Sequence, residues 1–140
     1  MGDLEMIKDI EKLLNMPYWI IDILPRQVEK DSPGQYFAIE KYYITEPQRL
    51  IIKQRHINII LKLNCYRDIS LWEEDEINPD PEILADVMNK NYVNIIIDDA
   101  LIVSAPDETY LTIYNPDEDL LNMLKILAAG EGLYVWRPEQ

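Results

Sequence analysis

The sequence predicts a single α+β domain, in which an antiparallel sheet carries helices on one face. Runs rich in β-branched and aromatic residues alternate with segments whose apolar residues recur every three or four positions. Proline, asparagine and aspartate clusters separate these segments, as expected of turns and helix starts. The length of 140 residues is normal for one domain and sufficient for a hydrophobic core. We therefore expect residues 1–140 to fold as one unit.

The first third of the chain predicts a helix followed by a hairpin. Apolar residues at helical spacing indicate an amphipathic helix from Leu4 to Leu14, which Pro17 ends. The β-branched and aromatic run Tyr18–Leu24 predicts a strand. Residues Tyr36–Ile44 fit either a strand that pairs with Tyr18–Leu24 or a helix, and the pattern does not decide between them.

The middle of the chain predicts a helix and then a long strand. Thr45 and Gln48 have the spacing of a capping box, so residues 46–55 should be helical. Residues 57–72 give the clearest strand signal, because apolar and polar residues alternate with period two. The apolar positions of this alternation are Ile57, Ile59, Leu61, Leu63, Cys65, Ile69 and Leu71.

The second half predicts two helices and three strands. Asp80–Pro81 is an N-cap followed by an N1 proline and predicts a helix through Met88. Residues 92–97 fit a helix or a strand, whereas 101–104 and 110–114 predict a hairpin. Asn115–Pro116 should cap the next helix, which ends near Gly130, and residues 133–136 should form a closing strand. From residue 57 onward this order resembles the ferredoxin-like βαββαβ arrangement.

The net charge of −13 comes from one interval of the chain. Residues 68–124 hold fifteen acidic side chains and the single base Lys90, which gives −14 there and +1 elsewhere. A charge imbalance confined to one part of a chain indicates a partner of opposite sign. Helix capping, turn formation and solubility also account for many of these acids. An acidic protein is repelled by phosphate backbones, so we expect no direct nucleic-acid binding.

A candidate partner-binding site follows from the densest part of this interval. The acidic run has no basic neighbour in sequence, and two aromatic residues of the predicted long strand lie before it. Tyrosine and tryptophan anchor many interfaces, because one end of each side chain is apolar and the other polar. The candidate residues are Tyr66, Trp72, Glu73, Glu74, Asp75 and Glu76.

Catalytic, metal-binding and cofactor-binding residues are not predicted. His56 is the only histidine and has no second histidine with which to share a metal, and Cys65 falls on the buried side of the predicted long strand. The acids of residues 73–82 lack the glycine and spacing of a calcium loop. The sequence contains no phosphate-binding loop, nucleophile elbow or zinc-protease motif. An enzyme that uses His56 with carboxylates is the second alternative to the main prediction.

Two further observations bear on origin and compartment. A single cysteine and the lack of a long apolar run or secretory signal favour a cytoplasmic protein with no membrane association. Residues 17–28, 32–43 and 132–138 resemble a small family of bacterial cytoplasmic proteins with no assigned activity. The resemblance covers about half of the chain and implies no functional residue.

The sequence therefore predicts a non-enzymatic protein that binds a basic protein through an acidic face, as inhibitors and immunity proteins do. The first alternative is a regulatory domain that senses a small molecule, and the second is an enzyme with a His56–carboxylate site. The oligomeric state does not follow from the sequence.

Overall fold

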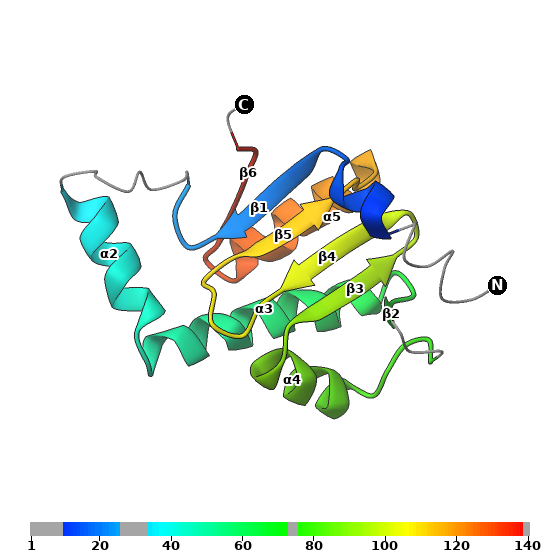
Figure 1. The fold of residues 1–140 in the computed structure, drawn as a ribbon, viewed down its shortest axis with the longest axis horizontal. Helices are drawn as coiled ribbons and strands as arrows, with labels where there is room; N and C mark the ends of the chain where they lie inside the picture. Colours follow the sequence, from blue (N-terminus) through cyan, green and yellow to red (C-terminus); the bar gives the residue numbers. More distant parts are fainter. Residues whose placement is uncertain (1–9, 26–33, 73–75, 139–140) are drawn as a thin grey trace.

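The computed structural model describes residues 10–25, 34–72 and 76–138, which form an α+β fold with a six-stranded sheet (Figure 1). The strand order is β2-β3-β4-β5-β1-β6, and every paired strand is antiparallel. The strands are β1 (Tyr18–Asp22), β2 (Ser70–Leu71), β3 (Val93–Ile97), β4 (Ala100–Ser104), β5 (Leu111–Tyr114) and β6 (Tyr134–Trp136).

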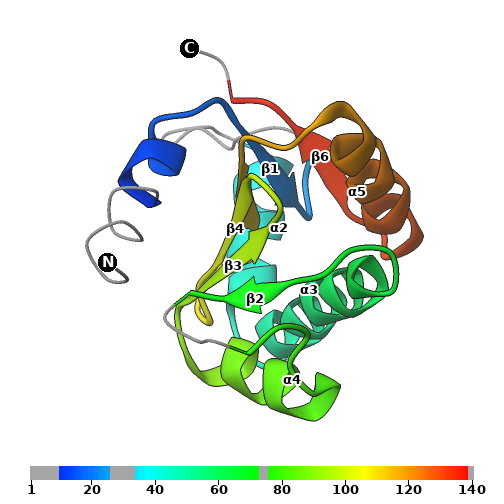
Figure 2. The ribbon, with the colours of Figure 1, turned by 90° about the vertical axis from the view of Figure 1, so that its right-hand side faces the viewer.

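Three helices cover one face of this sheet, which confirms the predicted α+β class with its antiparallel sheet. They are α3 (Gln48–Asn64), α4 (Pro81–Lys90) and α5 (Glu118–Gly130) (Figure 2). A helical segment at residues 10–14 lies on the opposite face. Helix α2 (Gln35–Ile44) precedes α3 and projects away from the sheet (Figure 1).

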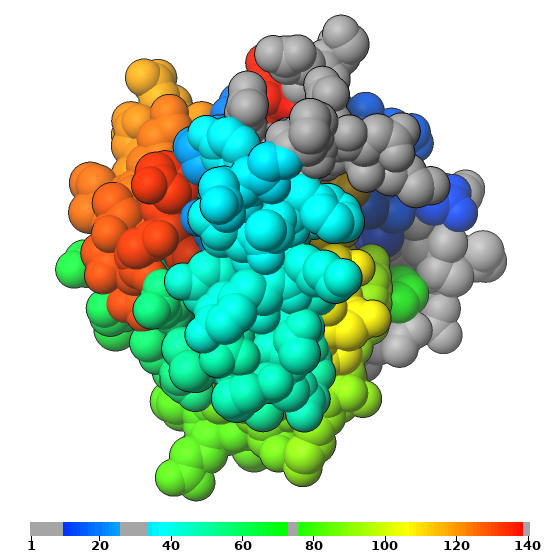
Figure 3. Space-filling view, turned by 90° about the vertical axis from the view of Figure 1, so that its left-hand side faces the viewer, coloured from blue at the N-terminus to red at the C-terminus, as the bar shows by residue number. Residues whose placement is uncertain are grey.

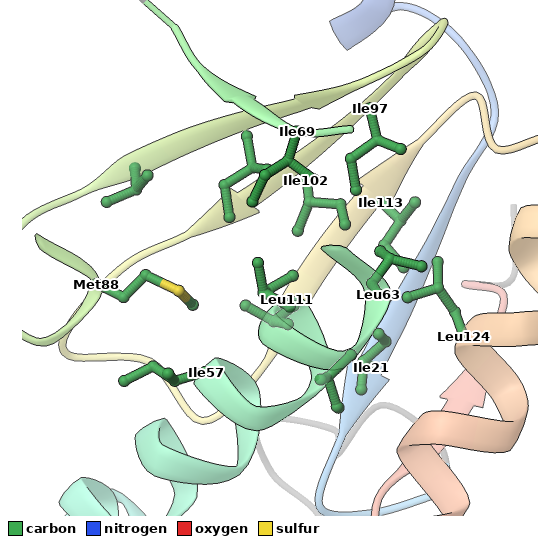
Figure 4. Close-up of a cluster of buried hydrophobic side chains, with 14 of the residues drawn as sticks. Ile21, Ile57, Leu63, Ile69, Met88, Ile97, Ile102, Leu111, Ile113 and Leu124 are labelled. Carbon is green, nitrogen blue, oxygen red and sulfur yellow. The ribbon is translucent and has the colours of Figure 1, made fainter. Parts of the chain in front are cut away.

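The core fills the space between the sheet and helices α3, α4 and α5 (Figure 4). One side of each central strand contributes fully buried residues, such as Ile21, Ile102 and Ile113, and the helices contribute Leu63 and Leu124. Burying one aliphatic side chain of this size is worth about 1.5–3 kcal/mol, so this layer is the main source of stability. The opposite side of the same strands faces away from this core.

The long strand predicted for residues 57–72 is wrong, because the first half of that interval belongs to α3. The buried positions of α3 follow helical spacing: Ile52, Lys53, His56, Ile57, Ile59, Ile60 and Leu63. A strand would have turned Ile60 to the side of the polar residues, whereas the helix buries it completely. The helix penalty of a β-branched residue is at most about 0.7 kcal/mol, far less than the burial gain. Only Ser70–Leu71 of the predicted run is a strand, at the edge of the sheet.

This change also alters the predicted topology. The ferredoxin-like order is not confirmed, because half of its expected first strand is helical and because three strands lie between α4 and α5, where that order has two. These three strands, β3, β4 and β5, are also successive neighbours in the sheet. Cys65 follows the end of α3 and is exposed, so the prediction of a buried cysteine is wrong. Residues 36–44 form helix α2 and residues 93–97 form strand β3, which resolves both ambiguous segments.

One of the three predicted helix caps is confirmed and the other two are wrong. Asp80 caps α4, and its side chain accepts a hydrogen bond from the Glu82 backbone N–H. The Thr45–Gln48 capping box is wrong, because the Thr45 hydroxyl donates instead to the Lys41 carbonyl. Asp117, rather than Asn115–Pro116, caps α5.

The end of α5 also differs from its prediction. Gly130 is the last residue of the helix, and the positive φ of 76° falls at Gly132. The strand predicted for residues 133–136 is confirmed as β6 at the sheet edge beside β1.

Candidate functional site

A cleft on the face of the sheet opposite α3 is the most distinctive surface feature among the described residues. Strand register builds it: Tyr18 pairs with Tyr114 across β1 and β5, and Ile20 pairs with both Thr112 and Trp136. Directly paired residues share a face of the sheet. The cleft has a volume of about 460 Å³, within the range of small-molecule sites. We call it the aromatic cleft, and its lining residues are Leu14, Tyr18, Ile20, Asp22, Glu40, Tyr110, Thr112, Tyr114, Trp136 and Pro138.

The chemistry of this lining is aromatic and acidic. Tyr18 and Tyr114 stack in a tilted arrangement with ring centroids 5.3 Å apart. The Trp136 indole donates a hydrogen bond of 3.0 Å to the Leu24 carbonyl, which fixes the ring at the edge of the cleft. Among the described residues that line the cleft, none is lysine, arginine or histidine, whereas two are carboxylates, Asp22 and Glu40. The described lining therefore offers aromatic faces and negative charge.

Asp22 is the buried carboxylate of the cleft, with only 7% of its surface exposed. Its Oδ1 accepts a hydrogen bond of 2.7 Å from the Ile23 backbone N–H. Burial raises the pKa of Asp22 to about 7, and the negative charges of Glu40 and Glu108 add to the shift. Such a carboxyl is partly protonated at neutral pH and would gain from a neighbouring positive charge.

The pKa values of two other ionisable residues of the cleft, Glu40 and Tyr110, are also shifted. Burial raises the pKa of Glu40. Burial is likewise the main cause of the raised pKa of Tyr110, and the charges of Glu108 and Asp22 contribute to it. Perturbed groups that share a cleft indicate a binding site more strongly than isolated ones do.

The structure describes three residues of the predicted partner-binding site. Tyr66 is 71% exposed in the turn after α3. Trp72 follows β2. Because neighbouring residues of a strand point to opposite faces and Leu71 points into the core, the Trp72 side chain lies on the face of the sheet away from the core. Glu76 is exposed, and Glu73, Glu74 and Asp75 lie outside the described residues.

Trp72 borders a second cleft of about 510 Å³, beneath the helical segment 10–14. Apolar side chains such as Leu13 and Ile96 line it together with Asp98 and Asp99. The indole nitrogen of Trp72 is buried and has no hydrogen-bond partner among the described residues. The lining of this cleft therefore combines apolar side chains with Lys12 and two carboxylates, and the buried indole nitrogen of Trp72 is not exposed in it.

The acidic residues of the interval 68–124 lie in several places. Asp98 and Asp99 precede β4, whereas Asp107 and Glu108 follow it, and the five residues of β4 separate the two pairs by roughly 17 Å. Arg67 bridges part of this charge, because its guanidinium contacts Asp98 at 2.7 Å and Asp117 at 2.8 Å. These two pairs of acids therefore lie at opposite ends of β4.

A second polar cluster lies inside the core. Lys53 Nζ lies 3.0 Å from Ser104 Oγ and 3.1 Å from His56 Nδ1, and all three residues are fully buried. Burial lowers the pKa of Lys53 to about 8, and burial with the Lys53 charge lowers the pKa of His56 to about 3. A serine beside a lysine of lowered pKa can act as a nucleophile, but neither cleft is lined by these residues. The cluster is therefore closed to a substrate.

Comparison with known proteins gives no functional assignment, since no family model, curated protein or solved structure matches this chain. The resemblance to small bacterial proteins stays a prediction. Among the described residues, no group of three histidine, cysteine or carboxylate side chains could hold a metal ion. Within the same residues, no helix has the length and apolarity that a membrane crossing requires.

Sequence reasoning missed the aromatic cleft, although part of its signal was present. Tyr18, Ile20 and Asp22 share one parity of a predicted strand, and Tyr110, Thr112 and Tyr114 share one parity of another. Period two places each set on one face of its own strand. The missing information was that β1 lies between β5 and β6, which brings the sets together.

Proposed function

We propose that this protein is a non-enzymatic binding protein whose aromatic cleft takes a small organic cation, such as an amine or a quaternary ammonium compound. The observation that supports this proposal is the composition of the lining: its described residues include four aromatic side chains and two carboxylates, and none of them is basic. A cation over an aromatic face gains about 0.5–2 kcal/mol, and more where water is excluded. The buried carboxyl of Asp22 supplies the opposite charge. This develops the small-molecule alternative from the sequence.

Titration calorimetry with choline and with its uncharged isostere, in which carbon replaces nitrogen, tests the proposal. We expect choline to bind and the isostere to bind at least tenfold more weakly, because shape is shared and only charge differs. A ligand at a hundred times its Kd also stabilises the fold by about 2.7 kcal/mol. A panel of primary and quaternary amines extends the comparison if choline itself is too large or too small.

Two variants locate the site. Tyr114→Leu removes a ring from the cleft and should weaken cation binding by about 2- to 30-fold, the range of one cation–π contact. Tyr66→Leu is the matched control, because it removes an exposed tyrosine from the turn after α3 and should leave binding unchanged. Equal binding of the cation and its isostere, or equal effects of the two variants, would contradict the proposal.

A second candidate function keeps the basic protein partner inferred from the charge. The second cleft supports it, because the Trp72 side chain lies with Asp98 and Asp99 on its lining, which also includes Lys12. An arginine-rich peptide should then bind with an affinity that falls as salt rises, and Trp72→Phe should weaken it. Trp136→Phe in the aromatic cleft is the control that separates the two candidates. A peptide that binds both variants equally would exclude this role for Trp72.

A further inference from the structure

The aromatic cleft is elongated, because its lining follows β1 from one end of the strand to the other. Tyr18, Ile20 and Asp22 all line it, and they lie on the same face of β1 because they alternate along the strand. A strand rises about 3.3 Å per residue, so Tyr18 and Asp22 mark two ends that are roughly 13 Å apart. A single ammonium group cannot contact both ends at once. The shape therefore suits a ligand with two separate binding groups.

The end of the cleft towards α2 is acidic. Asp22 and Glu40 line it, and the register of β1 with β5, continued by one residue, places Tyr110 opposite Asp22. The Trp136 ring also reaches this end, because its indole nitrogen donates to the carbonyl of Leu24. Figure 3 shows α2 (cyan) at the surface, between the C-terminal residues (red) and the connection from β4 to β5 (yellow). An ammonium group at this acidic end meets carboxylates and aromatic rings together.

The opposite end is aromatic, and β1 enters it from the helical segment 10–14 (Figure 1). Tyr18 and Tyr114 stack there with ring centroids 5.3 Å apart, and Leu14 also contributes to the lining. Tyr18 is 39% exposed, so a ligand can reach its ring. Ring faces attract cations, and phenol oxygens accept hydrogen bonds from N–H donors. We call this the tyrosine end, and it offers a second position for an ammonium group.

The surface between the two ends is uncharged. Ile20 and Thr112 are paired across β1 and β5, midway along the cleft, and both belong to its lining. A methylene chain gains by covering apolar surface of this kind, because that surface is removed from water. The middle of the cleft therefore suits an aliphatic chain that joins two charged groups.

Charge around the cleft favours a ligand with more than one positive group. The chain carries −13, and a negative field raises the local concentration of cations. Arg137 follows Trp136 in sequence, but its guanidinium carbon lies 5.1 Å from the centre of the Trp19 ring. Trp19 pairs with the buried Ile113 and so belongs to the core side of the sheet. This base is therefore directed away from the cleft.

We propose that the aromatic cleft binds a linear diamine or polyamine, with one terminal ammonium group at the acidic end and the other at the tyrosine end. This inference rests on the proposed function and specifies its ligand class. The methylene chain of the ligand lies over Ile20 and Thr112. A primary ammonium group, rather than an apolar tail, occupies the tyrosine end because it can use both the ring faces and the phenol oxygens.

Titration calorimetry in low-salt buffer tests the proposal with diamines from diaminobutane to diaminodecane, each compared with the monoamine of equal chain length. Each pair differs only in whether the far end is an ammonium or a methyl group. Diaminobutane is too short to reach both ends, so it should exceed butylamine only by the statistical advantage of two equivalent ends. The longer diamines should bind a further 2- to 30-fold more tightly than their monoamines, about the range of one cation–π contact.

Variants at each end locate the two positions. Tyr114→Leu and Tyr18→Leu should each reduce the advantage of the long diamines over their monoamines. Asp22→Asn should weaken both members of every pair, because both place an ammonium group at the acidic end. Tyr66→Leu is the matched control, since it removes an exposed tyrosine outside the cleft and should leave the advantage unchanged. The two tyrosine variants lie on different strands, so misfolding of one leaves the other to decide.

Two results would overturn this inference alone. One is a long diamine that binds no more tightly than its monoamine, which would place an apolar tail at the tyrosine end. The other is a diamine advantage that survives both tyrosine variants. In either case choline or a monoamine still binds, and the proposed function stands. If neither choline nor any amine binds, the proposed function fails and this inference fails with it.

Discussion

Replacing Asp22 by asparagine should change how stability depends on pH. Burial raises the pKa of this carboxyl from 3.8 to about 7, with Glu40 and Glu108 adding to the shift. The folded protein therefore holds a proton that the unfolded chain releases near pH 3.8. Between these values the folded state binds more protons, so its free energy of unfolding falls as pH rises. Asparagine cannot ionise, and its Oδ1 can still accept the hydrogen bond from the Ile23 N–H.

The magnitude follows from the two pKa values. A difference of about three pKa units, at 1.36 kcal/mol per unit, lowers the free energy of unfolding of the wild type by about 4 kcal/mol as the pH rises from 3.8 to about 7. The carboxyl is almost fully buried, so solvent screening reduces this little. The free energy of unfolding of Asp22→Asn should therefore rise relative to that of the wild type by about 1.4 kcal/mol per pH unit between pH 4 and 7. Above pH 8 the difference between the two proteins should be constant.

Urea unfolding of both proteins at each pH unit from 4 to 9 measures this difference. The comparison cancels contributions that the two proteins share, including that of His56. Asp86→Asn is a suitable control, because Asp86 is an exposed residue of α4 and its ion pair with Lys90 is worth at most about 1 kcal/mol. A flat difference curve for Asp22→Asn would refute the assigned pKa and the charge that we place in the cleft.

Three further variants test other parts of the fold. Burial keeps His56 neutral with a pKa of about 3, so the free energy of unfolding should fall as pH drops below 6.5. In the Asp22→Asn background, His56→Gln should remove this fall in an acid titration. Burial lowers the pKa of Lys53 to about 8, so the free energy of unfolding of the wild type should rise by about 3 kcal/mol between pH 8 and 10.5. Urea unfolding of Lys53→Met should not show this rise. Asp117→Ala should cost about 1–2 kcal/mol in thermal unfolding, because it removes the α5 cap and the contact with Arg67, whereas Asp117→Asn should cost less.

The fold was predictable where local chemistry alone determines structure. Asp80–Pro81 starts α4 because the carboxylate satisfies a backbone N–H and the proline lacks a donor that would be lost. The strands at 18–22 and 111–114 follow their β-branched and aromatic composition. In each case the signal lies within a few neighbouring residues.

The prediction failed where tertiary packing decides between two periodicities. Residues 57–63 fit both a strand and a helix, since Ile57, Ile59 and Leu63 are apolar at period two while Ile60 and Leu63 continue a helical stripe. The choice depends on Ile52 and His56 one turn earlier, which become buried only when α4 and α5 pack alongside. A window confined to residues 57–72 cannot contain that information.

The candidate site depends on the same non-local information. The negative charge that appeared dominant in the sequence is spread over both ends of β4, and Arg67 bridges two of its carboxylates. The aromatic cleft draws instead on β1 and β5, which are separated by almost ninety residues. Strand order, rather than charge density along the chain, brings functional groups together here.

The energetics of Asp22 connect stability with the proposed ligand. No cationic side chain lines the cleft in the part of the chain that the structure describes, so the buried carboxyl of Asp22 destabilises the fold at neutral pH, whereas a hydrophobic residue there would not. An organic cation would favour the charged form of this carboxyl and so lower its pKa on binding. Binding should therefore release a proton near pH 7, strengthen as pH rises through that value, and lose this pH dependence in Asp22→Asn. The proton whose loss from Asp22 destabilises the fold is then the same proton that a bound cation displaces.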